Sequence, residues 1–359
     1  MKIAVLGSGN GGCAVAADCA LHGYDVSIFD FPQFSSNIDA IANAKGIRVT
    51  GQVEGFAPIS YSGSDISKAT QNADLIYVVG PSYSHIPMAR AYKDVMRPGQ
   101  KIIVNPGTNG GALVFKKELG IPFSDSSIIV AETSTLPYAC RIQNPGEVHV
   151  YLKLKDGLYI ASLPASGNQE VYNLFSPVYP GSIQYKNVFQ TILQNGNNVI
   201  HPAISLLNVG RIESPEDFLF YEQGVTPAGG RLMKAVDEER MAIAKALGVG
   251  ILSEPEVGIV QGYMTENNYD TGYSKAPGFK GILAQTQIDY RYFTEDVGFG
   301  LVLLTDLAKV VGVKTPVMDA IIQIVSVLLE RDFQKEGQRT LESFGLNDLS
   351  KKELIDMVS

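Results

Sequence analysis

The sequence contains few of the residues from which covalent crosslinks and metal centres are built. Among its 359 residues there are only three cysteines, Cys13, Cys19 and Cys140, and none of them forms a CxxC pair. An odd number of cysteines without that spacing indicates reduced thiols rather than a disulfide framework or a zinc site. We therefore expect no bound metal and a cytoplasmic location.

Long apolar runs and runs of basic charge are also absent. The longest apolar stretch, around 320–329, is accompanied by Asp319, Gln323 and Ser326 and is too short to cross a bilayer. A net charge of −8, with both signs interspersed, argues against nucleic acid or an anionic membrane as a partner. Lys2 leads directly into an apolar strand, so we expect no cleaved signal peptide.

Glycine, in contrast, is abundant, and it is concentrated where the first apolar strand ends. The strand at 3–6 leads into a turn and then an alanine-rich helix. The residues of this turn are Gly7, Ser8, Gly9, Asn10, Gly11 and Gly12. The GxGxxG spacing permits a tight turn, a close approach of the backbone to phosphate, and a helix N-terminus aimed at a pyrophosphate. The turn therefore predicts a dinucleotide site.

An acidic residue follows at the position that this type of site requires. Asp30 ends the second strand, at 26–29, and lies 18 residues beyond Gly12. A carboxylate there accepts hydrogen bonds from both ribose hydroxyls of an adenosine and repels a 2′-phosphate. No lysine or arginine follows until Lys45. We therefore expect NAD as the cofactor, with NADP as the alternative.

Further strands alternate with helices or loops, as in a doubly wound parallel sheet of the Rossmann type. The expected strands span 46–50, 75–79, 101–105 and 127–132. Two of them end in turn-forming residues, Gly80-Pro81 and the stretch 105–111. Because a cofactor lies beyond the carboxyl ends of such strands, we expect Pro81 to contact it. Either turn is equally well explained as ordinary loop structure.

The second half of the chain has a different pattern. Short strands are expected between 148 and 163, and the sequence is helical from about 185 onward. The predicted organisation is therefore α/β, with a Rossmann domain at 1–183 and an all-helical domain at 184–359, which is apolar enough to form a homodimer. Residues 262–281 show no helical or strand periodicity, and loops of this length often cover active sites. We interpret this segment as a lid over the cleft.

One expected helix, at 194–211, divides cleanly into polar and apolar faces. The polar stripe is uncharged and consists of Gln194, Asn198, His201, Ser205 and Asn208, opposite Val199, Ile200, Ala203, Leu206 and Leu207. A solvent-exposed face would normally carry Lys and Glu, so this stripe is predicted to line a wet cavity. Pro202 removes one helical hydrogen bond beside His201. The imidazole of His201 is a candidate for proton transfer at the carbon that accepts hydride.

Residues 289–296 contain an arginine and several carboxylates, any of which could orient an imidazole. Arg291 has two interpretations. Its guanidinium could hold a substrate carboxylate through two parallel hydrogen bonds, which a lysine cannot mimic. It could instead form an i,i+4 ion pair with Glu295 and have no role in the reaction. The spacing does not decide between the two.

The chain resembles the octopine/nopaline or opine dehydrogenases, most closely the bacterial N-(1-carboxyethyl)-norvaline dehydrogenases. The resemblance runs nearly end to end and is carried by GSGNGG at 7–12, NPGTNGGAL at 105–113, ETSTLPYACR at 132–141, NVIHP at 198–202, RYFTEDVGFGLV at 291–302 and TLESFGL at 340–346. It implies a reductive condensation, in which an α-keto acid such as pyruvate and the amino group of an amino acid form an imine that NADH or NADPH reduces.

The resemblance also implies roles for individual residues. His201 would transfer the proton, Asp296 would be its carboxylate partner, and Arg291 would hold a substrate carboxylate. Thr135 and Cys140 match positions near the keto-acid site, and Asn198 belongs to the matching NVIHP motif. A buried structural thiol is an equally simple interpretation of Cys140.

Two alternatives from other classes remain. One is a hydroxy-acid dehydrogenase of the ketopantoate reductase or glycerol-3-phosphate dehydrogenase type, but those families use a lysine in the second domain, where this chain has Asn198 and His201. The other is a protein that senses NADH without catalysis, which the presence of His201, Arg291 and Asp296 disfavours.

Overall fold

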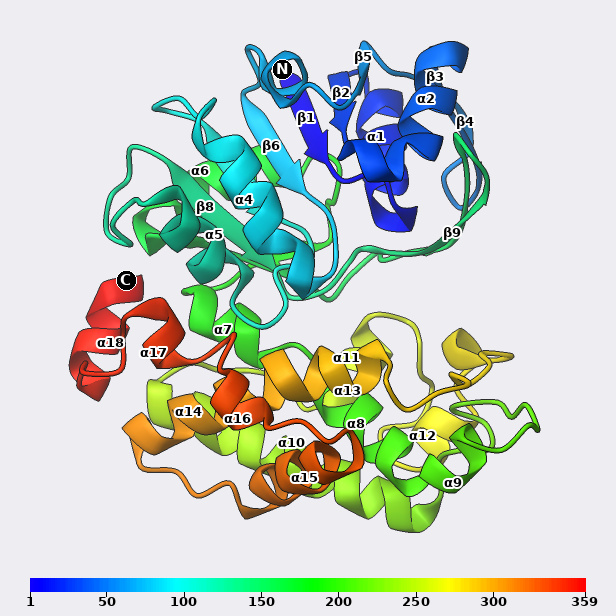
Figure 1. Ribbon diagram of the computed structural model, residues 1–359, viewed down its shortest axis with the longest axis vertical. Coiled ribbons are helices and arrows are strands. Elements are labelled where there is room, and N and C mark those ends of the chain that lie inside the picture. Colours follow the sequence, from blue (N-terminus) through cyan, green and yellow to red (C-terminus); the bar gives the residue numbers. More distant parts are fainter. The chain divides into compact units, whose positions relative to one another are not determined.

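The computed structural model describes residues 1–359, and the chain divides into two compact units. The first unit comprises Met1–Thr191 together with Met357–Ser359, and the second comprises Ile192–Asp356. In Figure 1 the first unit runs from blue to green, apart from its three C-terminal residues in red, and the second from green to red. The domain boundary expected at 183/184 stays a prediction.

The first unit is built on an eight-stranded sheet. Across the sheet the strands are β12 (Ser182–Gln184), β11 (Leu158–Leu163), β8 (Ile129–Thr133), β7 (Lys101–Val104), β6 (Leu75–Val78), β1 (Lys2–Leu6), β2 (Asp25–Phe29) and β5 (Tyr61–Gly63). Neighbouring strands are parallel except β11, which runs antiparallel to β8. The predicted Rossmann-like α/β sheet is confirmed, with this one reversal.

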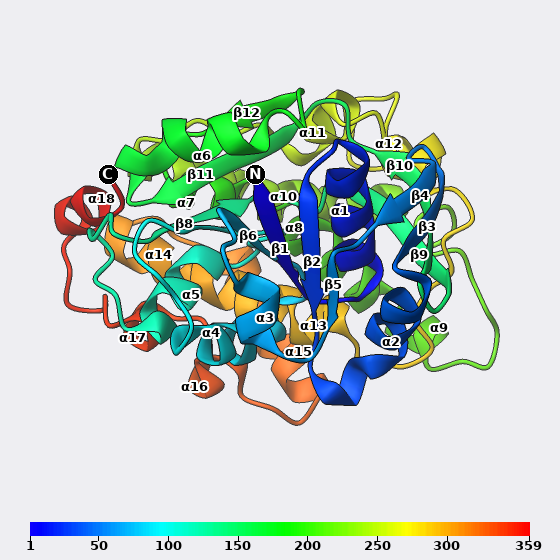
Figure 2. The ribbon, with the colours of Figure 1, turned by 90° about the horizontal axis from the view of Figure 1, so that it is seen from above.

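Helices cover both faces of the sheet (Figure 2). Ile3, Val5 and Tyr77 share a core with α1 and α6, whereas α3, α4 and α5 pack on the other face. This alternation follows from the two-residue period of a strand. The helices of this unit are α1 (Asn10–Leu21), η1 (Pro32–Phe34), α2 (Ser35–Ala44), α3 (Ile66–Thr70), η2 (Ser82–Ser84), α4 (His85–Lys93), α5 (Gly111–Leu119), η3 (Ala165–Gly167) and α6 (Asn168–Phe175). The division between the units falls within α7 (Val188–Leu193).

A second sheet of four strands corrects one expectation. Residues 46–50 were expected in the main sheet, but β3 (Gly46–Gly51) belongs to a sheet ordered β4 (Gly55–Pro58), β3, β10 (Glu147–Lys153) and β9 (Tyr138–Asn144). In β3, Ile47 and Val49 are buried, whereas Arg48 and Thr50 are exposed. Such alternation is typical of a sheet with one covered face, here packed on α1, and not of a central parallel strand.

The second unit is helical, as predicted, and its only strand-like pairing is an isolated bridge between Leu219 and Leu283. The long helix α10 packs against α8, α14 and α15. The helices are α8 (Asn197–Leu207), α9 (Val209–Ile212), α10 (Pro227–Leu247), α11 (Glu254–Val260), α12 (Thr271–Ser274), η4 (Pro277–Phe279), α13 (Arg291–Thr294), the π-helical η5 (Asp296–Leu301), α14 (Val302–Val311), α15 (Pro316–Leu328), α16 (Phe333–Glu336), α17 (Leu341–Phe344) and α18 (Lys351–Val358). None of them combines the length and apolar character that a bilayer crossing requires.

The segment 262–281 is more structured than its sequence suggested. It contains α12 and η4, and Tyr273 and Ala276 within it are buried. The ring of Phe279 stacks on those of Tyr263 and Tyr273. Aromatic packing without helical periodicity therefore orders this segment, and its role as a lid stays a prediction.

Candidate active site

The glycine-rich turn has the geometry that a dinucleotide requires. Gly7 has a φ of +115°, and a Cβ there would collide with the carbonyl of Val79. A Cβ on Gly12 would collide with the carbonyl of Gly7, whereas Gly9 faces open space. The turn thus leaves a bare backbone at the N-terminus of α1, where backbone N–H groups can bind a pyrophosphate.

Asp30 lies at the end of β2 and is bound to the same turn. Its Oδ2 accepts hydrogen bonds from the Ser8 N–H at 2.6 Å and the Ser8 hydroxyl at 2.8 Å, and its Oδ1 accepts from the Phe31 N–H at 2.9 Å. The carboxylate therefore fixes the turn, and its binding of a ribose stays a prediction.

Other predicted cofactor residues lie around the first turn of α1. The Asn10 side chain accepts a hydrogen bond from the Ile142 N–H at 2.8 Å, and this bond links the first turn of α1 to β9. A Cβ at Gly11 would meet Leu136 and Val79, which follow β8 and β6. Thr135 directly precedes Leu136, and Pro81 follows two residues after Val79. The ends of β1, β6 and β8 therefore meet at the glycine turn.

Cys140 lies in β9 and is buried. Burial raises the pKa of its thiol to about 11, so the group stays protonated at neutral pH. Such a thiol packs as a small apolar group. A contact between Cys140 and a keto acid stays a prediction, and a role as a nucleophile is not supported.

Glu132 is a residue to which sequence reasoning gave no role. It is buried in β8, and its carboxylate accepts hydrogen bonds from the Ala112 N–H at the start of α5 and from the Thr191 hydroxyl, at 2.8 and 2.7 Å. A Cβ on Gly107 would collide with its side chain. Glu132 therefore holds the loop 105–111 in place. It is the first residue of the ETSTLPYACR motif, but the motif alone does not indicate this structural role.

In the second unit, His201 projects from α8, and both of its ring nitrogens and its ring face have close neighbours. Its Nδ1 lies 2.8 Å from Oδ2 of Asp296, and its Nε2 lies 3.2 Å from the hydroxyl of Tyr221. The ring of Tyr292 stacks on the imidazole at 3.9 Å between centroids, and Phe220 packs at 6.1 Å. These contacts leave His201 only 7% exposed and fix its orientation.

Asp296 begins the π-helical turn η5, an irregularity that is frequent at functional sites. Burial raises the pKa of Asp296 above its ordinary value, and the adjacent His201 opposes that rise. As a carboxylate, Asp296 accepts the hydrogen on Nδ1 and leaves the lone pair of a neutral imidazole on Nε2. The pair can therefore take up or release a proton at Nε2.

Arg291 begins α13 and lies five residues before Asp296 in the sequence. Its Nη2 lies 3.3 Å from Oε2 of Glu295, so the ion pair that the spacing allowed does form. Its side chain nevertheless remains 48% exposed. The remaining N–H groups can bind a carboxylate, so the ion pair and the substrate clamp are compatible.

The polar stripe on and beside α8 is buried, and the expectation that it lines a wet cavity is wrong for Gln194, Ser205 and Asn208, which bind protein groups instead. The Gln194 amide forms hydrogen bonds with the backbone of Leu252. The Ser205 hydroxyl accepts a hydrogen bond from the Gln285 amide at 3.0 Å, and the Asn208 amide donates hydrogen bonds to two backbone carbonyls. Gly300 in η5 leaves room for the side chain of Asn198. On the opposite face Leu207 is 53% exposed, because the helix ends there at the surface.

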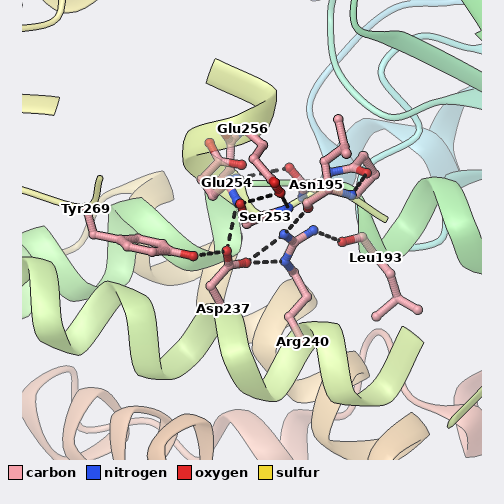
Figure 3. A network of polar contacts seen from close by, with 11 residues as sticks. Leu193, Asn195, Asp237, Arg240, Ser253, Glu254, Glu256 and Tyr269 are labelled. Carbon is pink, nitrogen blue, oxygen red and sulfur yellow. Dashed lines mark hydrogen bonds and ion pairs between the residues drawn. The ribbon is translucent and has the colours of Figure 1, made fainter. Parts of the chain in front are cut away.

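A buried ionic network lies beside the N-terminus of α8 (Figure 3). Asp237 and Arg240 on α10 are paired at 2.6 Å, and the guanidinium also donates to the carbonyls of Leu193 and Leu252. The second oxygen of Asp237 accepts from the Glu254 N–H at 2.8 Å and the Tyr269 hydroxyl at 2.6 Å. The network therefore connects α10, α11 and the residues leading into α8.

Glu254 occupies the space beside Gly196, the N-cap residue of α8. A Cβ on Gly196 would collide with the Glu254 carboxyl group, whose Oε2 is buried without a hydrogen-bond partner. Burial, together with the nearby charge of Asp237, raises the pKa of Glu254 to about 8. Sequence reasoning missed this residue because its partners come from separate elements.

Comparison with known proteins gives concordant results over the whole chain. A family model described as NAD/NADP octopine/nopaline dehydrogenase, alpha-helical domain, matches residues 184–329. The opine dehydrogenase of Arthrobacter sp. (strain 1C) is 38% identical over 352 residues, 97% of this chain and 96% of that protein. The protein ocs of Agrobacterium tumefaciens (strain Ach5) is 29% identical, covering 96% of this chain and 95% of its own. A solved octopine dehydrogenase with NADH and L-arginine is similar at a TM-score of 0.81 and 19% identity, covering 99% and 98% of the two chains.

Proposed function

This chain belongs to the opine dehydrogenase family, and we propose that His201, Asp296 and Arg291 carry its reaction. It is an NAD(P)-dependent oxidoreductase that condenses an α-keto acid with an amine and reduces the product, or oxidises it in reverse. The observation that carries the residue assignment is the buried pair of His201 and Asp296, held at 2.8 Å. The substrates we propose are pyruvate or a similar keto acid, and the amino group of an amino acid.

The glycine turn, the N-terminus of α1 and Asp30 fit a dinucleotide, because any Cβ at Gly7 or Gly12 would collide with the backbone. When bound there, the reduced nicotinamide supplies the hydride. The chain's own residues bind and orient the substrates. Asp296 holds the imidazole, so that Nε2 of His201 can take a proton from the ammonium group of the substrate amine and give it to the oxygen that departs as water when the imine forms, or take one from water in reverse. Arg291 binds a substrate carboxylate through its exposed N–H groups.

The test is a spectrophotometric assay of the purified protein with NADH and pyruvate, to which L-amino acids are added singly. A parallel series contains NADPH. NADH consumption that requires both the keto acid and an amine supports the proposal and ranks the donors. Consumption with a keto acid alone would instead indicate a hydroxy-acid dehydrogenase. No consumption with any pair would favour an NADH sensor.

Replacing Arg291 with lysine should chiefly raise the KM for the keto acid. Lysine keeps the positive charge but loses the two parallel N–H groups, and the loss of one charge-assisted hydrogen bond corresponds to roughly a 10-fold change. Steady-state kinetics at saturating NADH measure the effect. Replacing the exposed Lys234, which pairs only with Glu238, by arginine is the control. An unchanged KM in the Arg291 variant would mean that the ion pair with Glu295 is its whole role.

Replacing Asp30 with alanine should relax the preference for NADH over NADPH. The change removes the charge that repels a 2′-phosphate, and we expect the ratio of kcat/KM for the two cofactors to fall about 10-fold. Asp30→Asn is the matched variant, because it removes the charge while its side-chain oxygen can still accept from Ser8. If neither variant alters the ratio, other groups distinguish the two cofactors.

A further inference from the structure

The two ring nitrogens of His201 have different partners. Nδ1 faces the carboxylate of Asp296, whereas Nε2, the nitrogen through which a proton would pass, faces the Tyr221 hydroxyl at 3.2 Å. Tyr221 lies in the coil between α9 and α10 and is buried. The proton-transferring atom of the proposed reaction is therefore already hydrogen-bonded to a phenol.

The ring of Tyr221 is held by aromatic neighbours. It stacks on Phe279 at 4.3 Å between centroids and at an interplanar angle of 15°, and it meets Phe220 edge to face at 5.0 Å. Phe279 also stacks on Tyr273, from the same segment 262–281. With its ring packed in this way, Tyr221 has little freedom to move its hydroxyl away from Nε2.

A phenol in this position can serve both states of the imidazole. Burial raises the pKa of Tyr221 well above its ordinary value, so the hydroxyl keeps its proton throughout the physiological range. It can donate to Nε2 of a neutral imidazole and, after rotation about the C–O bond, accept from Nε2–H of an imidazolium. A carboxylate or an ammonium group could do only one of these.

We propose that Tyr221 is a positioning residue of the reaction, whose hydroxyl holds Nε2 of His201 in both protonation states. Because the hydrogen bond to a charged imidazolium is stronger than that to the neutral ring, Tyr221 favours the imidazolium. At 3.2 Å the contact leaves room for the Nε2–H to be shared between the Tyr221 oxygen and a substrate oxygen, to which the proton then passes. The inference rests on the proposed function of His201, but the contact itself can be tested without turnover.

The kinetic test compares two Tyr→Phe substitutions in the same aromatic cluster. Tyr221→Phe keeps the ring and removes the hydroxyl, and we expect kcat to fall roughly 10-fold with the KM for the keto acid and the Kd for NADH nearly unchanged. Tyr273→Phe is the control, because the Tyr273 hydroxyl is buried without a hydrogen-bond partner. It should retain wild-type kcat. Equal kcat values for the two variants would overturn the proposal.

A spectroscopic test does not depend on activity. The chain has four histidines, so the imidazole ¹⁵N signals can be assigned by single substitutions. In the wild type we expect the Nδ1–H tautomer of His201 and a slowly exchanging phenolic proton close to its ring. In Tyr221→Phe the Nε2 signal should shift while those of the other three histidines remain. Absence of the phenolic contact in the wild type would refute the inference even if the variant failed to fold.

The two tests also separate this inference from the proposed function. If the wild-type protein consumes no NADH with any pair of substrates, the proposed function fails, and the ¹⁵N spectra still decide whether Tyr221 binds His201. If the enzyme is active and the Tyr221 variant behaves as the Tyr273 variant does, only the inference about Tyr221 fails.

Discussion

Replacing His201 with alanine should lower kcat by about 10²–10⁴-fold, the usual contribution of a positioned proton-transfer group. The affinity for NADH should stay nearly the same, because the glycine turn and Asp30 belong to the first unit and His201 to the second. The expected signature is therefore a loss of turnover without a loss of cofactor binding. Single-turnover kinetics and fluorescence titration with NADH measure the two quantities.

His201→Asn provides the control for this experiment. Alanine leaves Asp296 as a buried carboxylate without its partner, which by itself is destabilising. Asparagine retains an N–H donor on the side of Asp296 but cannot exchange a proton. If both variants fold and both lose turnover, the loss comes from the missing proton transfer. Full turnover in either would exclude His201 from the mechanism.

The second large effect concerns Glu254 and the pH dependence of stability. The network holds one guanidinium and two carboxyl groups, and Arg240 balances the charge of only one of them. Asp237 accepts hydrogen bonds from Arg240, Tyr269 and the Glu254 N–H, so it is the carboxylate. Glu254 keeps its proton in the folded chain because burial raises its pKa from 4.5 to about 8.

The folded state therefore holds a proton that the unfolded chain releases above about pH 4.5. Wherever the folded state binds more protons, the free energy of unfolding falls as pH rises. This contribution to stability is complete below pH 4.5 and is lost as the pH approaches 8. At about 1.4 kcal/mol per pH unit, the expected loss between pH 6 and pH 8 is on the order of 2 kcal/mol.

Glu254→Gln should abolish this part of the pH dependence, because the amide has the same shape and no proton to lose. Urea unfolding at pH 6, 7 and 8 measures how the free energy of unfolding changes with pH. As the pH rises, the free energy of unfolding of the variant should increase relative to that of the wild type. Glu256→Gln on the same helix is the control, since Glu256 is exposed and caps the helix through Ser253. It should lower stability without removing the alkaline decline. Parallel slopes for wild type and Glu254→Gln would contradict the assignment.

The parts of the molecule that the sequence predicts well are those determined by neighbouring residues. The order of strand, glycine turn, helix and Asp30 lies within thirty residues, and a Cβ on Gly12 would collide with the carbonyl of Gly7 in the same turn. The helix carrying His201 was likewise recognised from its periodicity, within a few residues of its ends. The Arg291–Glu295 ion pair, one of the two interpretations that the spacing left open, does form because i,i+4 residues meet on any helix.

The parts that were missed depend on tertiary contacts. β3 was assigned to the wrong sheet because its pairing with β10 joins residues about a hundred positions apart. The polar stripe on and beside α8 was expected to line a wet cavity because the protein groups that bind it, such as Leu252 and Gln285, are distant in the sequence. Tyr221 lies in coil, where no periodicity marks a side chain as close to His201.

The close fit between Gly196 and Glu254 has an evolutionary consequence. Gly196 has a φ of −76°, which every residue type adopts readily, so its backbone does not require glycine. The requirement comes from the carboxyl group of Glu254, which fills the space of a side chain. A lineage that exchanged Glu254 for a smaller residue would release position 196 to vary. The substitution histories of the two positions should therefore be linked, although Gly196 has no side chain that could bind Glu254.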